Sequence, residues 1–248
     1  GTVTFNTNAS TVVNNGPFYN VIHNVPANSA HYHLYDGDTV IAGSFTVQDA
    51  TSRGTGYVMI EVDNTIVVTG DVTLSEKFDA CQSGTRDKDT TFGSLTIESG
   101  GTYSATSGTT TLTARDGSDW GLLNTGTFTP NNGLVKFSGA LMQIRMSDFP
   151  FYDLEIAATG VGSFEAGSGT LVVNNNLTVS SGTFLMDAGV DDNLIVHGLT
   201  TIASGTSFTG GTGTMTHNGL VTNIGTYLTS SGTNNFNGGV RNLGTFTS

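Results

Sequence analysis

The histidine pair in His31-Tyr32-His33, followed by Asp36 and Asp38, is the part of this sequence with the clearest capacity for metal chemistry. Residues two apart share one face of a β-strand, so His31 and His33 would point the same way, as would Asp36 and Asp38. Imidazole and carboxylate groups together are ligands for zinc and other transition metals. The alternative is that all four residues are exposed at a strand end, beside the turn at 36–38. These four residues are the candidate metal ligands.

Two aspartate-rich turns, at 36–38 and 190–193, could bind Ca²⁺ through carboxylate oxygens. Neither turn carries the Gly-Gly-x-Gly-x-Asp repeat of calcium-binding β-rolls. The alternative is that each aspartate caps the backbone of its own turn. We therefore expect no cofactor, with Ca²⁺ as the one exception that these turns would allow.

The sequence contains no recognisable catalytic motif. It has neither a Gly-x-Ser-x-Gly nucleophile elbow nor a lysine-containing phosphate loop. Polysaccharide lyases and hydrolases need paired carboxylates across a groove, or Ca²⁺ with a basic residue, and the 8 Lys and Arg residues do not gather around such a pair. We expect no enzyme and no catalytic residue. A polysaccharide-degrading β-helix stays as an alternative, because its acids can be distant in sequence.

The composition favours strands and turns over helices. The 248 residues include 34 Gly and 4 Pro, and no long stretch has apolar residues at helical spacing. A formal net charge of −12 argues against binding to nucleic acid or to anionic membranes. No apolar run approaches the ~20 residues that span a bilayer. Cys81 is the only cysteine, which excludes an intrachain disulfide.

Landmarks in the first half of the chain recur in the same order in the second half. Gly1–Phe5 matches Gly133–Phe137, and Asn124–Phe128 matches Asn242–Phe246. Self-similarity of this kind is typical of repeat architectures. We predict two repeat units, 1–132 and 133–248, taken from a longer array.

One charged segment interrupts this pattern. Residues 75–92 are charged and aperiodic, and the second unit has no counterpart to them. We predict an insertion here that loops out from the repeat, since surface loops lengthen at little cost. Residues 193–248, in contrast, contain no acidic residue and one basic residue, Arg241.

A shorter period lies within the long one. Asn223–Tyr227 recurs as Asn242–Phe246, a step of 19 residues, and within each step apolar and polar residues alternate between Gly or Asn-Gly turns. Such a step, with two or three short strands, is one coil of a solenoid. The predicted fold is all-β, a right-handed parallel β-solenoid (β-helix) of tandem repeats. Tandem β-sandwich domains are the alternative, because a unit of this length also fits that fold.

Three segments carry a resemblance to known surface proteins: Gly133–Phe137, Pro150–Ile156 and Asn175–Phe184. They resemble the low-charge β-solenoid repeats of filamentous adhesins, autotransporter passenger regions and phage tail fibres or spikes. The resemblance implies exposure outside the cell, on a cell surface or on a virion, with a scaffold or attachment role. It carries no catalytic residue across.

We therefore expect a structural or adhesive segment of an extracellular or virion surface fibre or filament. It would act as a passive scaffold by coil stacking, through self-association end to end or with neighbouring repeats of a longer chain. The first alternative is a module that binds a glycan or receptor through residues 75–92 or the face at 31–38. The second is the polysaccharide lyase or hydrolase.

Threonine-rich strands at 109–111 and 125–127 suggest a further hypothesis, an ice-binding surface. Such a surface needs flat rows of threonine that recur in every coil. The sequence alone shows no such recurrence, which makes ice binding the weakest of the hypotheses.

Overall fold

The computed structural model describes residues 1–6, 11–14, 17–25, 32–49, 57–60, 64–80, 87–146, 150–164, 169–186 and 192–248. These residues form short strands joined by turns, and none of them is helical. Accordingly, the described ranges contain no helix long and apolar enough to cross a membrane.

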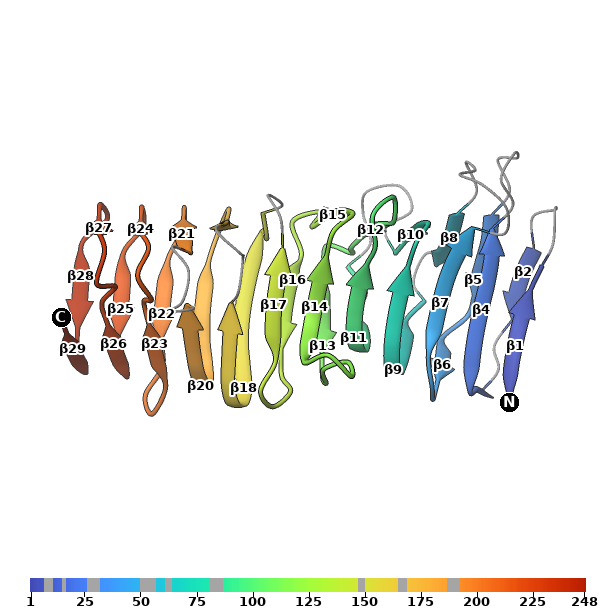
Figure 1. Cartoon of the computed structure of the whole chain (residues 1–248), viewed down its shortest axis with the longest axis horizontal. Helices are drawn as coiled ribbons and strands as arrows, with labels where there is room; N and C mark the ends of the chain where they lie inside the picture. Colours follow the sequence, from blue (N-terminus) through green and yellow to red (C-terminus); the bar gives the residue numbers. More distant parts are fainter. Residues whose placement is uncertain are drawn as a thin grey trace. The chain divides into compact units, whose positions relative to one another are not determined.

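The chain divides into two compact units. The first contains residues 1–116 and 123–133, and the second contains residues 117–122 and 134–248. Strand β14 (Trp120–Asn124) crosses the division. In each unit the strands are arranged in three ladders, visited in turn as the chain advances (Figure 1).

In the first unit, ladders A and B belong to one sheet, because β9 and β11 run from B into A, and ladder C is a sheet of its own. Ladder A contains β1 (Thr2–Phe5), β4 (Asn20–Val25), β7 (Phe45–Asp49) and the second parts of β9 (Ile66–Leu74) and β11 (Thr90–Ile97). Ladder B contains β3 (Pro17–Phe18), β6 (Thr39–Ile41), the first parts of β9 and β11, and β13 (Thr109–Leu112). Ladder C contains β2 (Thr11–Asn14), β5 (Tyr32–Asp36), β8 (Tyr57–Ile60), β10 (Lys77–Asp79), β12 (Thr102–Ser104) and β15 (Thr127–Thr129).

The second unit repeats this plan, with β18 and β20 running from ladder D into ladder E. Ladder D contains β16 (Leu134–Phe137), the first parts of β18 (Asp153–Phe164) and β20 (Leu177–Met186), β22 (Thr200–Ile202), β25 (Val221–Asn223) and β28 (Val240–Asn242). Ladder E contains β17 (Gln143–Met146), the second parts of β18 and β20, β23 (Ser207–Thr209), β26 (Thr226–Leu228) and β29 (Thr245–Thr247). Ladder F contains β19 (Thr170–Val173), β21 (Asn193–Val196), β24 (Met215–His217) and β27 (Asn234–Phe236).

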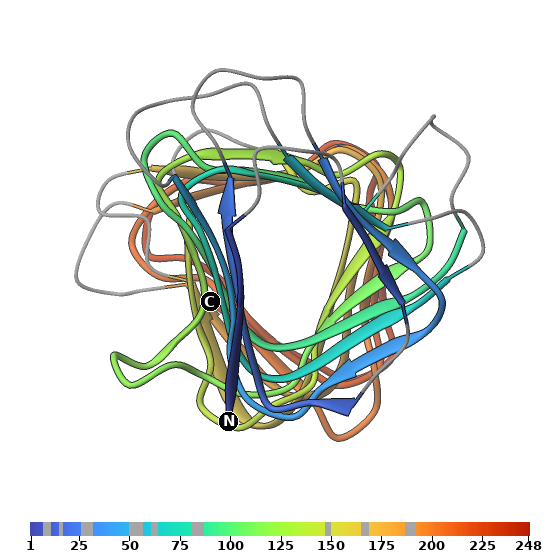
Figure 2. The same ribbon diagram turned by 90° about the vertical axis from the view of Figure 1, so that its right-hand side faces the viewer.

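Every strand pairing described in these ladders is parallel, and each strand pairs with the equivalent strand one coil later. This pattern confirms the predicted parallel β-solenoid and rules out the β-sandwich alternative, whose sheets are antiparallel. In Figure 2 the N-terminus lies nearest to the viewer, and the first unit winds clockwise as it recedes, which is the right-handed sense.

The coils vary in length more than the sequence indicated. The predicted step of 19 residues holds at the C-terminal end, where Asn223 stacks on Asn242. Elsewhere, hydrogen-bonded partners on adjacent coils are separated by 18 residues at Asn20 and Thr2 and by 27 at Asp38 and Thr65. Part of the extra length lies in longer strands, since β7 has five residues and β26 has three.

Alternation along each strand places one side chain inward and the next outward. The inward positions of ladder E form an aromatic column with ring centroids 4.8–5.8 Å apart, and ladder C has a similar column at 5.7–5.9 Å. Each ring pair adds roughly 0.5–1.5 kcal/mol to the stabilisation from burial. The columns are Phe184–Phe208–Tyr227–Phe246 and Phe78–Tyr103–Phe128.

Glycines stack at the corners between strands because a side chain there would strike the adjacent coil. A Cβ atom on Gly126 would lie 2.4 Å from the Glu98 carbonyl oxygen. A Cβ atom on Gly225 would lie 2.3 Å from that of Ala203. These glycines therefore allow coils to approach to the spacing that the backbone pairing requires.

The segment 75–92, which was predicted to loop out as an insertion, contains a strand at 77–79 and the start of β11 at 90–92. Residues 77–79 form β10 in ladder C, and Phe78 is fully buried in the aromatic column. The sequence did not indicate this strand, because its outward residues, Lys77 and Asp79 on either side of Phe78, are charged. Residues 81–86 lie outside the described residues.

Candidate functional site

The structure gives only part of the predicted metal cluster. His31 lies outside the described residues, and His33 is described only as a backbone position in β5. Asp36 and Asp38 are exposed. Within the described ranges, no group of three or more His, Cys, Asp or Glu residues is arranged to hold a metal ion. The metal site involving His31 and His33 therefore stays a prediction.

Asp38 has a structural partner in the next coil. Its Oδ1 atom accepts hydrogen bonds from the Thr65 backbone N–H at 2.7 Å and from the Thr65 hydroxyl at 3.0 Å. These two bonds lower the pKa of Asp38, because they stabilise the charged form. Asp38 therefore caps a backbone group of the next coil, and not the backbone of its own turn as the alternative interpretation expected.

The same device recurs through the molecule. Side-chain oxygens of Asp or Asn accept hydrogen bonds, at 2.7–2.9 Å, from a backbone N–H on the following coil. Each bond satisfies a backbone group at a turn, where the ladders do not. The acceptors are Asn20, Asp89, Asp153, Asn176 and Asn193.

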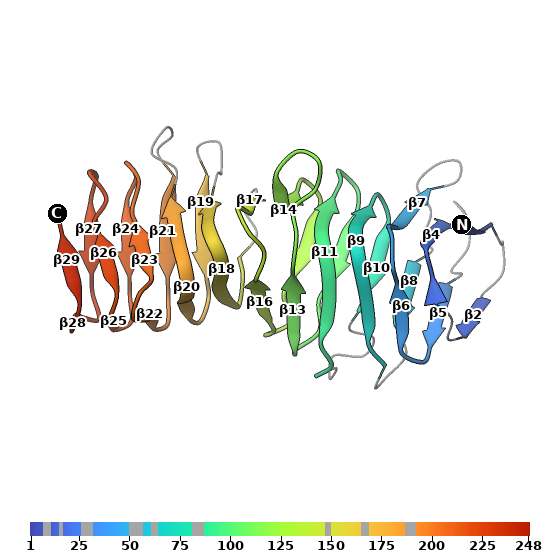
Figure 3. The ribbon, with the colours of Figure 1, turned by 90° about the horizontal axis from the view of Figure 1, so that it is seen from below.

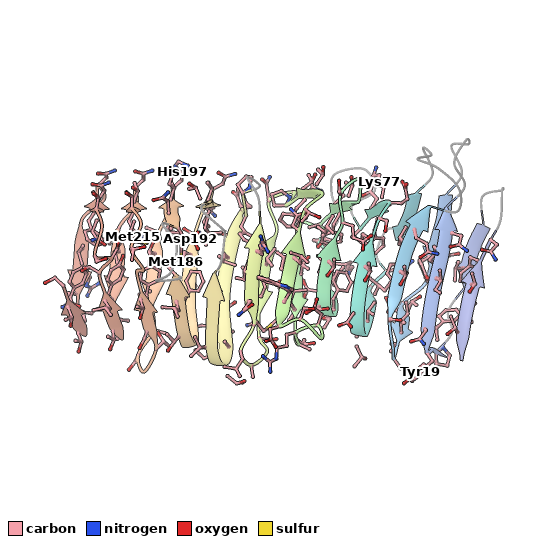
Figure 4. All side chains as sticks on the ribbon, viewed as in Figure 1. Tyr19, Lys77, Met186, Asp192, His197 and Met215 are labelled. Carbon is pink, nitrogen blue, oxygen red and sulfur yellow. The ribbon has the colours of Figure 1, made fainter. Side chains whose placement is uncertain are left out.

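The second aspartate turn is only partly described. Residues 190 and 191 lie outside the described residues, and Asp192 is fully buried. Asp192 and Met215 lie within the outline of the second unit in Figure 4, whereas exposed His197 lies at its margin. Binding of Ca²⁺ at this turn therefore stays a prediction.

A shallow hollow of about 220 Å³ opens on ladder D. The Lys136 ammonium lies 3.1 Å from a Glu155 carboxylate oxygen, which also accepts a hydrogen bond from Ser180 at 2.6 Å. Asp153 accepts hydrogen bonds from the Asn176 backbone at 2.8 Å and the Asn175 side chain at 3.0 Å. The hollow is lined by Leu134, Asp153, Leu154, Glu155, Asn176 and Thr178.

Residues two apart on one strand point to the same face, and their positions are about 6.6 Å apart along the strand. Asp153 and Glu155 are the kind of pair that the sequence analysis sought for polysaccharide cleavage, and it did not identify them. Both are occupied by partners from neighbouring coils, an arrangement that serves coil stacking. The Thr178 hydroxyl and the Asn176 amide nitrogen can still hydrogen-bond to a ligand at the hollow, whereas the Asn176 oxygen already accepts from Leu199.

The outward side of ladder E has a different character. Between β20 and β29 its outward residues form two columns that carry hydroxyl or aliphatic groups and no charge. We call this surface the hydroxyl face, and β23, β26 and β29 can be followed in Figure 3. Its columns are Thr183–Ser207–Thr226–Thr245 and Leu185–Thr209–Leu228–Thr247.

Hydroxyl rows recur from coil to coil on this face, contrary to the expectation from the sequence. The recurrence was hidden because coil lengths differ, so that Thr183 pairs with Ser207 after 24 residues and Ser207 pairs with Thr226 after 19. The alternation of hydroxyl and aromatic residues in Ser207-Phe208-Thr209 was the sequence feature that could have indicated this face.

Sequence reasoning also missed two buried histidine–tyrosine pairs. His23 lies 2.7 Å from the Tyr35 hydroxyl in the first unit. In the second, His217 lies 2.8 Å from the Tyr227 hydroxyl and 2.8 Å from the Thr200 hydroxyl. Burial lowers the pKa of His217 to about 4 and raises the pKa of Tyr227. The lowered pKa keeps His217 neutral near pH 7, and both pairs place hydrogen-bonded polar groups in the interior.

The fold defines the class of this protein as a parallel β-solenoid. Comparisons of the chain with family models, with curated proteins and with solved structures found no match.

Proposed function

We propose that this chain is a structural segment of an elongated fibre exposed on a cell surface or a virion. The observation that carries the proposal is that the main contacts of the fold run along the stacking direction. Backbone pairing, aromatic columns and Asp or Asn caps all join one coil to the next. A chain built in this way resists separation of its coils, which is the property that a scaffold needs.

Hydrogen-bonded rows of amide side chains add to this design. Asn237 donates to Asn218 at 2.8 Å, and Asn223 donates to Asn242 at the same distance. Gln48 donates to Asn24 in the first unit, also at 2.8 Å. Stacked amides of this kind reinforce parallel in-register strands. They support the structural role and contribute no reactive group.

The last described coil offers edges for further stacking. Strands β27, β28 and β29 each pair with one neighbour among the described strands. Leu243 is 60% exposed and Val240 is 40% exposed in this coil. Open parallel edges beside apolar side chains favour the addition of another coil, from a second copy or a neighbouring repeat.

Sedimentation velocity and negative-stain imaging of the purified 248-residue chain test this proposal. We expect rods that lengthen as protein concentration rises. Phe246→Lys places a charge at the open end and is expected to leave single particles. Thr216→Lys, on the outward side of ladder F, is the matched control and should assemble normally. Compact single particles at every concentration of the unchanged chain would contradict the proposal.

A second candidate function is glycan binding at the hollow on ladder D. Carboxylate, amide and hydroxyl groups over Leu134 and Leu154 match the mixed polar and apolar surface of a sugar. A glycan array can compare the unchanged chain with Thr178→Trp, which fills the hollow, and with Thr96→Trp, a control on ladder A. Signal that is lost only in Thr178→Trp would support this function, and a blank array for the unchanged chain would remove it.

A further inference from the structure

We propose that the hydroxyl face of the second unit binds ice. The inference is independent of fibre assembly, because it concerns the outward side of ladder E and not the coil edges. It begins from the chemistry of the surface. Six of its eight outward residues carry a hydroxyl group, the other two are leucines, and none is charged.

The register makes this surface a regular lattice. The pairings β20–β23, β23–β26 and β26–β29 run without a register shift, so equivalent residues stand directly above one another. Adjacent strands lie about 4.7–4.9 Å apart, and outward residues on one strand lie about 6.6 Å apart. A regular two-dimensional array of hydroxyl groups with fixed spacings can hold a layer of water in a repeated arrangement.

The hydroxyl groups are available to water. Among the described residues, no side-chain hydrogen bond joins the hydroxyls of Thr183, Ser207, Thr209, Thr226, Thr245 or Thr247 to the rest of the protein. Ladder A of the first unit differs, because Ser94 donates to Asp71 at 2.7 Å and Gln48 donates to Asn24. Its polar side chains bond to one another along the axis, whereas those of the hydroxyl face are left for an external partner.

Charge and rigidity select ice over other partners. A charged or ionic ligand has no counterion here, since residues 193–248 contain one charged residue, Arg241, and it lies on ladder D. Threonine methyl groups and the leucines Leu185 and Leu228 order the water beside them, while the hydroxyls anchor that water by hydrogen bonds. The paired backbone holds both groups in place, so little conformational entropy is lost when the ordered layer joins a crystal.

Ice-affinity partitioning tests the proposal. Ice is grown slowly through a dilute solution of the whole chain, and the protein in the ice fraction is compared with that in the liquid. We expect several-fold enrichment in ice for the unchanged chain. Thr226→Lys, at the centre of the face, should abolish the enrichment. Thr216→Lys, an outward threonine of ladder F with similar exposure, should retain it.

Three results would overturn the inference: exclusion of the unchanged chain from ice, equal enrichment of the two variants, or equal loss in both. Thermal unfolding of each variant checks that the fold persists. If Thr226→Lys unfolds, Thr245→Lys on the more exposed β29 replaces it, with Asn235→Lys on ladder F as its control. Loss in Thr245→Lys alone supports the proposal, and retained enrichment contradicts it.

Discussion

Two regions of this protein are built from the same local motif and present different surfaces. Asn124-Thr125-Gly126-Thr127-Phe128 leads from β14 into ladder C of the first unit, and Asn223-Ile224-Gly225-Thr226-Tyr227 leads from ladder D into ladder E of the second. In both, the glycine passes close to the preceding coil and the aromatic ring enters an internal column. The shared motif therefore determines the interior of the coil.

The outward residues distinguish the two regions. In ladder C the hydroxyl rows of β12 and β15 reach β10, where Lys77 and Asp79 form an ion pair at 3.1 Å. In ladder E the corresponding rows continue from β20 to β29 without a charge. The motif determines which of its own side chains point inward and outward. The strands on adjacent coils determine whether the outward side chains form a continuous uncharged surface.

The largest predicted effect is the removal of an inward ring. Phe208→Ala should lower the free energy of unfolding by about 3–5 kcal/mol, because Phe208 is fully buried between Phe184 and Tyr227. Phe78→Ala in ladder C should cost a similar amount. Urea denaturation followed by circular dichroism measures both. A loss below 1 kcal/mol in one of them would show that the two interiors are not equivalent.

The motif glycines should be nearly as sensitive. Gly225→Ala and Gly126→Ala each place a Cβ atom within 2.4 Å of a backbone oxygen on the preceding coil. We expect a loss of about 3 kcal/mol in each, since the coils must separate to relieve the contact. Gly117→Ala is the control, because a Cβ there meets nothing within 4 Å. Equal stability of all three variants would contradict the conclusion that Gly126 and Gly225 are needed for the close approach of adjacent coils.

Acid should weaken the second unit through His217. Its pKa in the folded chain is about 4, below the 6.5 of the unfolded chain, so the unfolded state binds the proton more readily between these values. Stability should fall as pH drops below about 6.5 and level off below about 4, with a total cost on the order of 3 kcal/mol. The free energy of unfolding is measured across this pH range. His217→Gln should lose this part of the pH dependence, whereas His197→Gln, at an exposed position, should keep it. An unchanged pH profile in His217→Gln would contradict the assignment.

The smallest effect sharpens the comparison of the two surfaces. The double change Lys77→Thr and Asp79→Thr would extend the hydroxyl rows of ladder C. Lys77 is 43% exposed, so loss of this ion pair should change the free energy of unfolding by less than about 1 kcal/mol. Thermal unfolding measures the change. A loss above 2 kcal/mol would mean that the ion pair supports β10 and is not an incidental surface contact.

Much of the interior was predictable from the sequence, and the acidic pair at the hollow was not. The alternation of apolar and polar residues within each 19-residue step predicted the strands and their inward side chains, because alternation depends on neighbours along the chain. Asp153 and Glu155 were missed as a pair because their hollow also needs Asn176 and Thr178 from the next coil. The strand at 77–79 was missed because its two outward charges outweighed a single inward phenylalanine.

The sequence by itself determined that the chain forms stacked parallel coils, since glycine corners, alternation and a recurring short step leave few other ways to bury its apolar residues. Only the tertiary structure decided which outward residues meet. Coil lengths differ, so residues separated by 19, 24 or 27 positions become neighbours through backbone pairing and not through spacing. The hydroxyl face is therefore a product of stacking register, which no single coil encodes.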